Sequence, residues 1–179
     1  LFLTSLVSWK CQVSVLEVVE MVDLICNQTA FMNQSFSIRN YQSSDQPFLI
    51  ELIRSNVPRY FAESEVDDFA QYLVAELENY WVLEVEDQIV GCGGVNFLDT
   101  NKARISWDMI HPDFQGIGLG QKLLNFRFDF LSSKGFDKVD VRTSQFSYMF
   151  YQKNGFNTFE IKPNYWFLGY DLYHMERDL

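Results

Sequence analysis

The sequence predicts an α/β domain, and three observations support this fold class. Strand-like and helix-like segments alternate from Phe36 to the end of the chain, as expected for a sheet covered by helices. The chain has 179 residues, of which 47% are hydrophobic, enough for one compact domain with a sizeable core and too little for two ordinary domains. The sequence contains no internal repeat or low-complexity tract that would indicate a different architecture.

The first half of this domain is predicted to contain three strands and two helices. The strands are expected at 36–41, 80–85 and 89–97, and the helices at 43–55 and 65–79. Ser43-Ser44-Asp45 provides an N-cap for the first helix, and Asn56-Val57-Pro58 ends it. Glu86-Asp87-Gln88 separates the second and third strands, and this short spacing predicts a β-hairpin.

The second half is predicted to add four strands and two helices. The strands are expected at 103–110, 138–143, 156–162 and 170–176, and the helices at 115–133 and 144–154. The segment His111-Pro112-Asp113-Phe114 is expected to form a turn. Gly135 and Gly155 follow the two helices, and glycine commonly ends a helix. The expected sheet therefore has six to seven strands, flanked by about four helices.

Residues 1–31 lie outside this pattern, and the domain is expected to occupy residues 32–179. The sequence begins with Leu rather than Met, so we interpret residues 1–31 as a fragment end or an upstream extension, with Met32 as a natural start. Ser14 to Ile25 has the spacing of an amphipathic helix. It either docks on a partner, or packs on its own domain or forms no stable structure. The apolar opening is too short to span a bilayer and has no cleavage site typical of a secretory signal.

The charge and the cysteine and histidine content exclude several function classes. There are 14 Lys and Arg residues against 24 Asp and Glu residues, a net charge of -10, which argues against binding to nucleic acid or anionic membranes. The three cysteines form no CxxC pair, which fits a reducing cytoplasm and suggests neither a disulfide framework nor a zinc site. The only histidines, His111 and His174, are far apart, so we expect no metal site. The oligomeric state is left open.

The most informative segment is the strand–turn–helix that contains Gly116, Gly118 and Gly120. These glycines fall where the strand ends and the helix begins, so backbone N–H groups can approach an anion without a Cβ in the way. The first helical turn and the positive end of the helix dipole point at the same spot. The pattern predicts a pyrophosphate site. Alternatively, the glycines serve a tight turn and close packing of the helix on the sheet.

Two motifs in this chain resemble those of the GNAT superfamily of acetyl-CoA-dependent N-acetyltransferases. Residues 115–120 (QGIGLG) are similar to its Q/R-x-x-G-x-G/A motif, and residues 150–156 (FYQKNGF) are similar to its later L-Y-x-K-x-G-F signature. The resemblance extends from about Phe36 to the C-terminus. It implies a mixed, twisted sheet whose fourth and fifth strands, 103–110 and 138–143, splay apart to admit the pantetheine arm of acetyl-CoA. It implies that acetyl-CoA is the cosubstrate and that its binding residues are Ile110, Gln115, Gly116, Ile117, Gly118, Leu119, Gly120 and Gln121.

The resemblance also assigns roles in catalysis. The attacking amine must be neutral, yet a lysine-like amine with a pKa of about 10.4 is mostly protonated at pH 7, so a base or a water chain has to remove the proton. In the family, the backbone N–H that matches Ile110 stabilises the carbonyl oxygen, and a tyrosine that matches Tyr151 assists departure of the thiolate. The alternative for Tyr151 is a core tyrosine with a satisfied hydroxyl.

The general base is harder to assign, because the positions that carry it in some family members are Arg104 and Ser106 here. Strand parity puts 104, 106, 108 and 110 on one face, so Asp108 is the nearest carboxylate to Ile110. Asp140 is a second candidate, because residues 140–142 (DVR) resemble the Glu-Val-Arg run of ribosomal-protein alanine N-acetyltransferases. Three alternatives remain open: Asp140 pairs with Arg142, Asp108 holds a loop through backbone hydrogen bonds, or water removes the proton.

The acceptor pocket is expected to be aromatic. The tail at 164–171 resembles the last hairpin of the alanine-acetylating enzymes and, with residues 57–61, would form a pocket in an acidic surround that favours a cationic amine. These rings would otherwise belong to the core. The sequence thus predicts a cytoplasmic N-acetyltransferase that acts on a primary amine of a small molecule or peptide. The alternatives are an alanine-type protein N-terminal acetyltransferase, an enzyme that uses another acyl group, and a non-catalytic acyl-CoA sensor.

Overall fold

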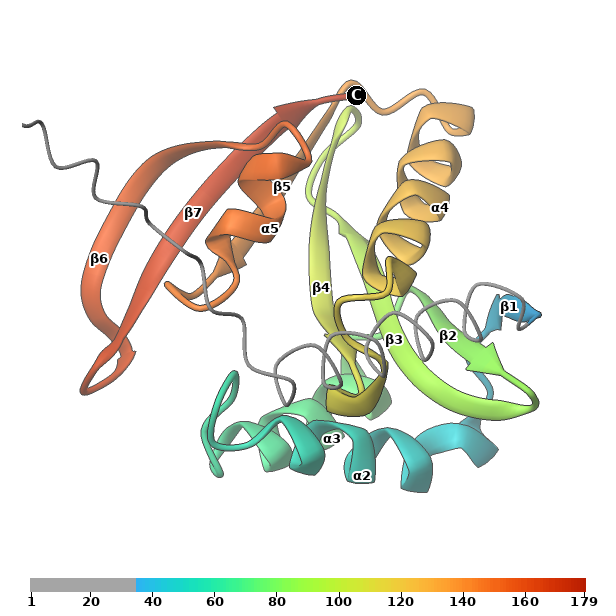
Figure 1. The fold of residues 1–179 in the computed structure, drawn as a ribbon. Coiled ribbons are helices and arrows are strands. Elements are labelled where there is room, and N and C mark those ends of the chain that lie inside the picture. Colours follow the sequence, from blue (N-terminus) through green and yellow to red (C-terminus); the bar gives the residue numbers. More distant parts are fainter. Residues whose placement is uncertain (1–34) are drawn as a thin grey trace, which may run out of the picture. The chain divides into compact units, whose positions relative to one another are not determined.

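The computed structural model describes residues 35–179, which form one seven-stranded sheet with helices on both faces (Figure 1). The strands are β1 (Phe36–Asn40), β2 (Asn79–Val85), β3 (Gln88–Phe97), β4 (Lys102–Ile110), β5 (Lys138–Thr143), β6 (Asn157–Phe167) and β7 (Tyr170–Asp178). The α-helices are α2 (Gln46–Asn56), α3 (Glu65–Ala75), α4 (Leu119–Ser133) and α5 (Tyr148–Lys153), and short 3-10 turns η1 (Ser43–Asp45) and η2 (Pro112–Phe114) precede α2 and α4. The expected helix at Ser14 to Ile25 and the expected start at Met32 lie outside the described residues.

The predicted strands and helices are all present, but α3 ends at Ala75 rather than Asn79, β6 extends to Phe167 rather than Lys162, and two helices start later than predicted. The long helix begins at Leu119 rather than Gln115, because Gly116 and Gly118 have φ values of 77° and 89° and leave the helical region. The next helix begins at Tyr148 rather than Ser144. No helix among residues 35–179 is long and apolar enough to cross a bilayer.

The predicted hairpin between β2 and β3 is confirmed. Glu86 and Asp87 have φ values of 50° and 64°, and Val85 pairs directly with Gln88. Two central residues with positive φ are typical of a type I′ turn, whose twist matches that of the flanking strands. The turn therefore fixes the register of the two strands that lead into β4.

Alternate residues of β2 build the two layers of the core. Tyr80 and Val82 are buried with residues of α2 and α3, including the fully buried Phe69. Trp81 points to the opposite face, where its ring lies 5.4 Å and 4.9 Å from the rings of Phe126 and Phe130 on α4. The period-two alternation of a strand thus gives the sheet an apolar face toward each helical layer.

The sheet divides between its fourth and fifth strands. The order β1-β2-β3-β4-β5-β7-β6 is antiparallel except at β4 and β5, which pair in parallel. This pairing joins only Lys102–Ile105 to Lys138–Val141, so the remainder of β4 has no strand beside it on that side. Figure 1 shows β6 and β7 turning away from β4. The splayed fourth and fifth strands expected from the resemblance are confirmed.

Candidate active site

A cavity of about 800 Å³ occupies the gap where β4 and β5 diverge. Its walls come from β4, β5, the start of α4, α5, the connection between α2 and α3, and the β6–β7 hairpin. The predicted site residues that line it are Asp108, Ile110, Gln115, Gly116, Gly118, Gly120, Gln121 and Tyr151. The structure therefore brings both sequence motifs to one cavity.

A β-bulge in β4 reorients the side chains that enter this cavity. Gly94 pairs with Ser106 and Cys92 with Met109, so that two residues of β4, Trp107 and Asp108, oppose Gly93. Trp107 has a φ of 47°, as expected for a bulge with increased local twist. The extra residue shifts the alternation of side chains by one position.

The prediction that residues 104, 106, 108 and 110 share one face is therefore wrong. The Ser106 hydroxyl donates to Asn96, whose side-chain oxygen also accepts from Tyr72 of α3. Asp108 instead contacts α4 and α5 on the opposite side of the sheet. Ile110 shares the side of Asp108, because a Cβ on Gly120 of α4 would lie 3.6 Å from the Ile110 side chain.

Asp108 belongs to a buried group of three side chains. Nη2 of Arg127, a fully buried residue of α4, donates to Oδ2 of Asp108 at 2.8 Å. The Tyr151 hydroxyl donates to the same oxygen at 3.0 Å. Burial and the nearby Asp108 carboxylate raise the pKa of Tyr151 well above 10. Tyr151 thus has a satisfied hydroxyl, as a core tyrosine would, and it also lines the cavity.

Gly93 makes room for this group. A Cβ at Gly93 would lie 2.5 Å from Nη1 of Arg127 and 2.9 Å from Oδ1 of Asp108, closer than van der Waals contact allows. The sequence analysis singled out neither Gly93 nor Arg127. The signal for Arg127 was its spacing, because it falls in the four-residue series Leu119, Leu123, Arg127 and Leu131 on the apolar face of α4. A charge at such a position has to find a buried counter-charge.

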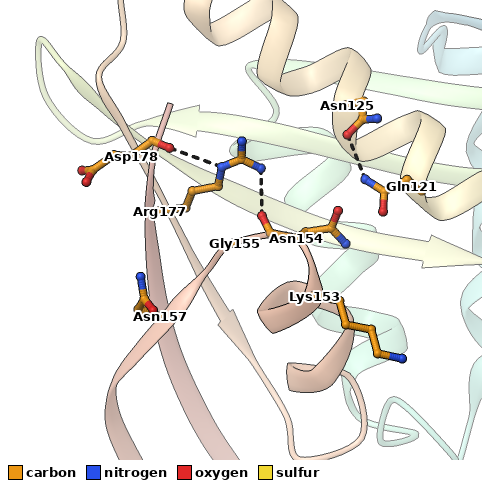
Figure 2. Close-up of a pocket in the computed structure, with 8 residues that line it drawn as sticks. All are labelled: Gln121, Asn125, Lys153, Asn154, Gly155, Asn157, Arg177 and Asp178. Carbon is orange, nitrogen blue, oxygen red and sulfur yellow. Dashed lines mark hydrogen bonds between the residues drawn. The ribbon is translucent and has the colours of Figure 1, made fainter.

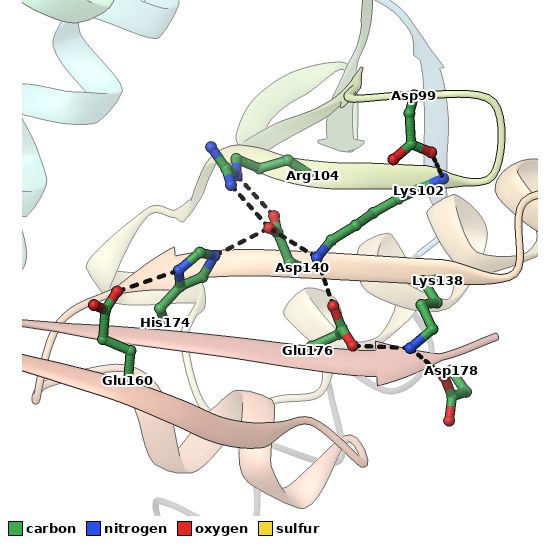
Figure 3. Close-up of polar contacts among 9 residues, drawn as sticks. All are labelled: Asp99, Lys102, Arg104, Lys138, Asp140, Glu160, His174, Glu176 and Asp178. Carbon is green, nitrogen blue, oxygen red and sulfur yellow. Dashed lines mark hydrogen bonds and ion pairs between the residues drawn. The ribbon is translucent and has the colours of Figure 1, made fainter.

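The second candidate base, Asp140, lies in a network of ion pairs outside the cavity lining (Figure 3). Arg104 holds both carboxylate oxygens at 2.7 Å and 2.8 Å, His174 lies 3.0 Å from Oδ2, and Lys102 lies 3.7 Å from it. Burial opposes ionisation of Asp140, but the hydrogen bonds from Arg104 and His174 outweigh it and keep its pKa below the ordinary value.

The alternative in which Asp140 pairs with Arg142 is wrong. Arg142 lines the cavity and donates instead to the hydroxyl of Tyr165 on β6. The side chains that contact Asp140 come from β4 and β7, the strands on either side of β5. The alternative in which Asp108 holds a loop through backbone hydrogen bonds also differs from the structure, since its partners are the Arg127 and Tyr151 side chains.

The turn before α4 leaves open space beside its backbone. A Cβ at Gly116 or Gly118 would meet no protein atom within 4 Å, and both glycines line the cavity. Gly118 is the N-cap residue of α4, so the unpaired N–H groups of the first turn lie next to this space. Such a helix start attracts anions. A Cβ at Gly120 would make only an ordinary contact with Ile110, so that position does not require glycine.

The Gln115 side chain holds this turn in place. Its Nε2 donates to the backbone oxygen of Ile110 at 2.9 Å and to Asn56 at 3.1 Å, and its Oε1 accepts from Tyr60 at 3.2 Å. These contacts tie the turn to β4 and α2. Ile117 and Leu119 are not among the lining residues, and Leu119 is buried.

A second, polar pocket of about 470 Å³ lies between α4 and the end of α5 (Figure 2). Its cationic side chains are Lys153 and Arg177, and Arg177 is held by donating to the backbone oxygen of Asn154 at 2.8 Å. Gln121 lines both this pocket and the larger cavity. The sequence analysis did not single out this pocket.

Aromatic side chains form the outer wall of the large cavity. Tyr60 and Phe61 line it from the α2–α3 connection, and Trp166 and Tyr170 line it from the β6–β7 hairpin. The Tyr170 hydroxyl donates to the backbone oxygen of Pro58, which links the hairpin to that connection. The structure thus brings together the two aromatic segments that the sequence analysis placed around the acceptor.

Comparison with known proteins identifies the class of this fold and site. Residues 76–158, which contain β4, the glycine turn, Asp108 and Tyr151, match the acetyltransferase (GNAT) domain family. This central part of the chain is therefore similar to the GNAT acetyltransferases.

Three individual proteins illustrate the similarity. The chain is 29% identical over 131 residues to the amino-acid acetyltransferase of Pasteurella multocida (strain Pm70), covering 73% of this chain and 29% of that protein. The structure of the ribosomal-protein-S18-alanine N-acetyltransferase from Escherichia coli gives a TM-score of 0.69 at 18% identity, over 80% of this chain and 94% of the other. The structure of a GNAT family acetyltransferase from Elizabethkingia anophelis with acetyl-CoA bound gives a TM-score of 0.65 at 19% identity, over 80% of this chain and 98% of the other. At such identities the two structures show a shared fold.

Proposed function

We propose that this chain is an acetyl-CoA-dependent N-acetyltransferase that transfers the acetyl group directly to a primary amine of a small molecule or peptide. The observation that carries the proposal is the single cavity between β4 and β5, which joins the open start of α4 to Asp108 and Tyr151. Anion binding and proton transfer are the two functions that such a reaction needs from the protein, and both have residues in this cavity.

The start of α4 is the proposed site for the pyrophosphate of acetyl-CoA. Gly116 and Gly118 leave space there, and the helix dipole favours negative charge. This local attraction matters because the chain as a whole carries a net charge of -10 and repels a polyanion at long range. Lys153 and Arg177 in the adjoining pocket offer two cations for the remaining phosphate.

The backbone N–H of Ile110 is the proposed donor to the carbonyl oxygen of the acetyl group. The N–H of the next residue, His111, donates to Val90 of β3 at 2.7 Å. Successive N–H groups of a strand point to opposite sides, so the Ile110 N–H points away from β3 toward the gap left by β5. A fixed donor at this position stabilises the negative charge that develops on the oxygen.

Asp108 is the proposed acceptor of the amine proton. The amine nitrogen forms a bond to the acetyl carbon, the carbon–sulfur bond breaks, and the proton released by nitrogen passes to the Asp108 carboxylate. Protonated Asp108 is a weaker acceptor than the carboxylate, so the Tyr151 hydroxyl turns to the negatively charged leaving sulfur. Because the pKa of Tyr151 is raised, it donates a hydrogen bond to the thiolate, and the proton reaches sulfur only as Asp108 replaces it.

The test of this function combines turnover with binding. The chain is mixed with acetyl-CoA and a panel of primary amines and peptides, and release of free CoA thiol is measured. Release that depends on the amine supports the proposal. Binding of acetyl-CoA without release for any acceptor would instead favour the sensor.

A glycine substitution tests the phosphate site with a matched control. Gly118→Val places a side chain in the proposed pyrophosphate space and should weaken acetyl-CoA binding at least about 100-fold. Gly135→Val is the control, because Gly135 also has a positive φ of 82° and open space but lies at the other end of α4. Equal affinities of the two variants in calorimetry would contradict the site.

A further inference from the structure

Arg142 is a half-buried cation of the cavity wall that has no carboxylate partner among residues 35–179. Two arginines on neighbouring elements are paired, Arg104 with Asp140 and Arg127 with Asp108. The chain has 24 acidic side chains against 14 Lys and Arg. Because acidic residues are this abundant, the lack of a carboxylate beside a guanidinium in a pocket needs an explanation. Its open donors point to a ligand.

The aromatic side chains of β6 hold the guanidinium in place. Its carbon lies 4.9 Å from the centre of the Tyr165 ring and 5.3 Å from that of Trp166, and Nη2 donates to the Tyr165 hydroxyl. Stacking on rings fixes the plane of an arginine while leaving its other N–H groups available. Arg142 is therefore preorganised to bind an anion.

The position of Arg142 separates it from the proposed phosphate site. Arg142 is two residues from Asp140 and shares its face of β5, and Asp140 contacts Arg104, which shares the face of Ser106. That face contacts α3 through Asn96 and Tyr72. The glycine turn belongs to α4, on the other side of the sheet. An anion at Arg142 therefore belongs to the acceptor rather than to the phosphates of acetyl-CoA.

From these contacts we infer that the acceptor is an amine that also carries a carboxylate, and that Arg142 binds this carboxylate. A guanidinium matches a carboxylate with two parallel N–H donors, so it selects for a planar anion. Glu65 and Glu76 line the same cavity and supply negative charge for the ammonium of the free acceptor. The inference rests on the proposed function and names the substrate class of that site.

The test compares acceptors in matched pairs. Each α-, β- or γ-amino acid is paired with its carboxamide, and the dipeptide Ala-Asp is paired with Ala-Asn, so that each pair differs mainly in one negative charge. We expect kcat/KM for the carboxylate member of at least one pair to exceed that of its neutral partner about tenfold or more, mainly through KM. Amides that react as well as or better than their acids in every pair would overturn the inference.

Three variants assign the preference to Arg142. Arg142→Ala should remove the preference, and Arg142→Lys should keep part of it, because lysine retains the charge without the planar donors. Arg54→Ala is the control, since Arg54 is an exposed arginine of α2 that pairs with Glu51 and does not line the cavity. A preference that survives Arg142→Ala, or that is lost equally in Arg54→Ala, would overturn the assignment.

Calorimetry with acetyl-CoA distinguishes the source of the anion. Arg142→Ala should leave the Kd for acetyl-CoA unchanged, and a Kd raised tenfold would place a phosphate at Arg142 and overturn the inference. Failure of the proposed function has a different signature, because then no member of any pair releases CoA while acetyl-CoA still binds. In that case the inference falls with the function.

Discussion

The aspartates Asp108 on β4 and Asp140 on β5 have the same side chain and opposite surroundings. Asp140 is 1% exposed and contacts two cations, Arg104 and Lys102, and the imidazole of His174. Asp108 is 11% exposed, lines the cavity, and has one cation and one phenol as partners. A carboxylate surrounded by cations is stabilised as an anion and has no reason to take up a proton. One balanced by a single cation at the edge of a cavity lies where a ligand can contact it.

The comparison predicts different consequences for the same substitution at the two sites. At Asp108 the loss should appear in the rate, and at Asp140 in the stability. A result in which both positions affect the rate alike would remove the distinction. The predictions that follow run from the largest expected effect to the smallest.

Asp108→Asn should lower kcat by about 10²- to 10⁴-fold, the range for loss of a general acid or base. The deficit should shrink as the pH approaches the pKa of the acceptor amine, because the free amine then needs no base. Steady-state kinetics between pH 6 and 10 measures this. A deficit that stays constant across this range would show that Asp108 only supports the structure, and Asp140→Asn is the matched control for loss of one buried charge.

Asp140→Asn should destabilise the fold by about 2–3 kcal/mol, because it leaves Arg104 and Lys102 beside a neutral amide. The estimate is below the full cost of breaking a buried pair, since side chains of these partners are 29% and 25% exposed. We expect kcat to change less than threefold. Denaturant unfolding and kinetics on the same sample test both statements, and a large loss of kcat with unchanged stability would make Asp140 the better candidate for the base.

Tyr151→Phe should lower kcat and kcat/KM together by about 10²-fold and leave the Kd for acetyl-CoA unchanged, because the hydroxyl acts only as the thiolate forms. Tyr148→Phe is the control: Tyr148 lies on the same helix, stacks on Tyr173 at 4.5 Å, and does not line the cavity. Reduced stability with kcat nearly intact in the Tyr151 variant would identify it as a core tyrosine without a catalytic role.

The sequence predicted the features that depend on local pattern. The order of strands and helices follows from hydrophobic spacing, and the β2–β3 hairpin follows from two turn residues. The splay of β4 and β5 came from the resemblance of two motifs and is confirmed. The boundary at residue 32, the roles of the site residues and the cytoplasmic location stay predictions.

The rest of the site depends on contacts between segments far apart in the chain. The bulge at Trp107 lies opposite Gly93 of another strand, where a Cβ would clash with Arg127 and Asp108. No sequence signal near Trp107 predicts this bulge. Simple alternation therefore placed Arg104 and Ser106 on the same face as Asp108, which is wrong. The partners of Asp140 likewise come from neighbouring strands whose register the sequence does not specify. The alternation of side chains along one strand does not specify which residues of another strand lie beside it.

The pH dependence of stability is the smallest of the expected effects, and it reports directly on the ionisation of Asp140. Its pKa in the folded chain lies below the ordinary value of about 3.9, so the ion pairs contribute stability above that pH. This contribution is lost as the pH falls through the lower, folded pKa. The difference in unfolding free energy between the unaltered chain and Asp140→Asn should therefore decrease as the pH falls from about 5 toward 3. Asp45, whose pKa Arg39 also lowers, is present in both chains and cancels from the difference. Denaturant melts at each pH measure it, and a difference that does not change between pH 5 and 3 would mean that Asp140 is not held as an anion by Arg104 and Lys102.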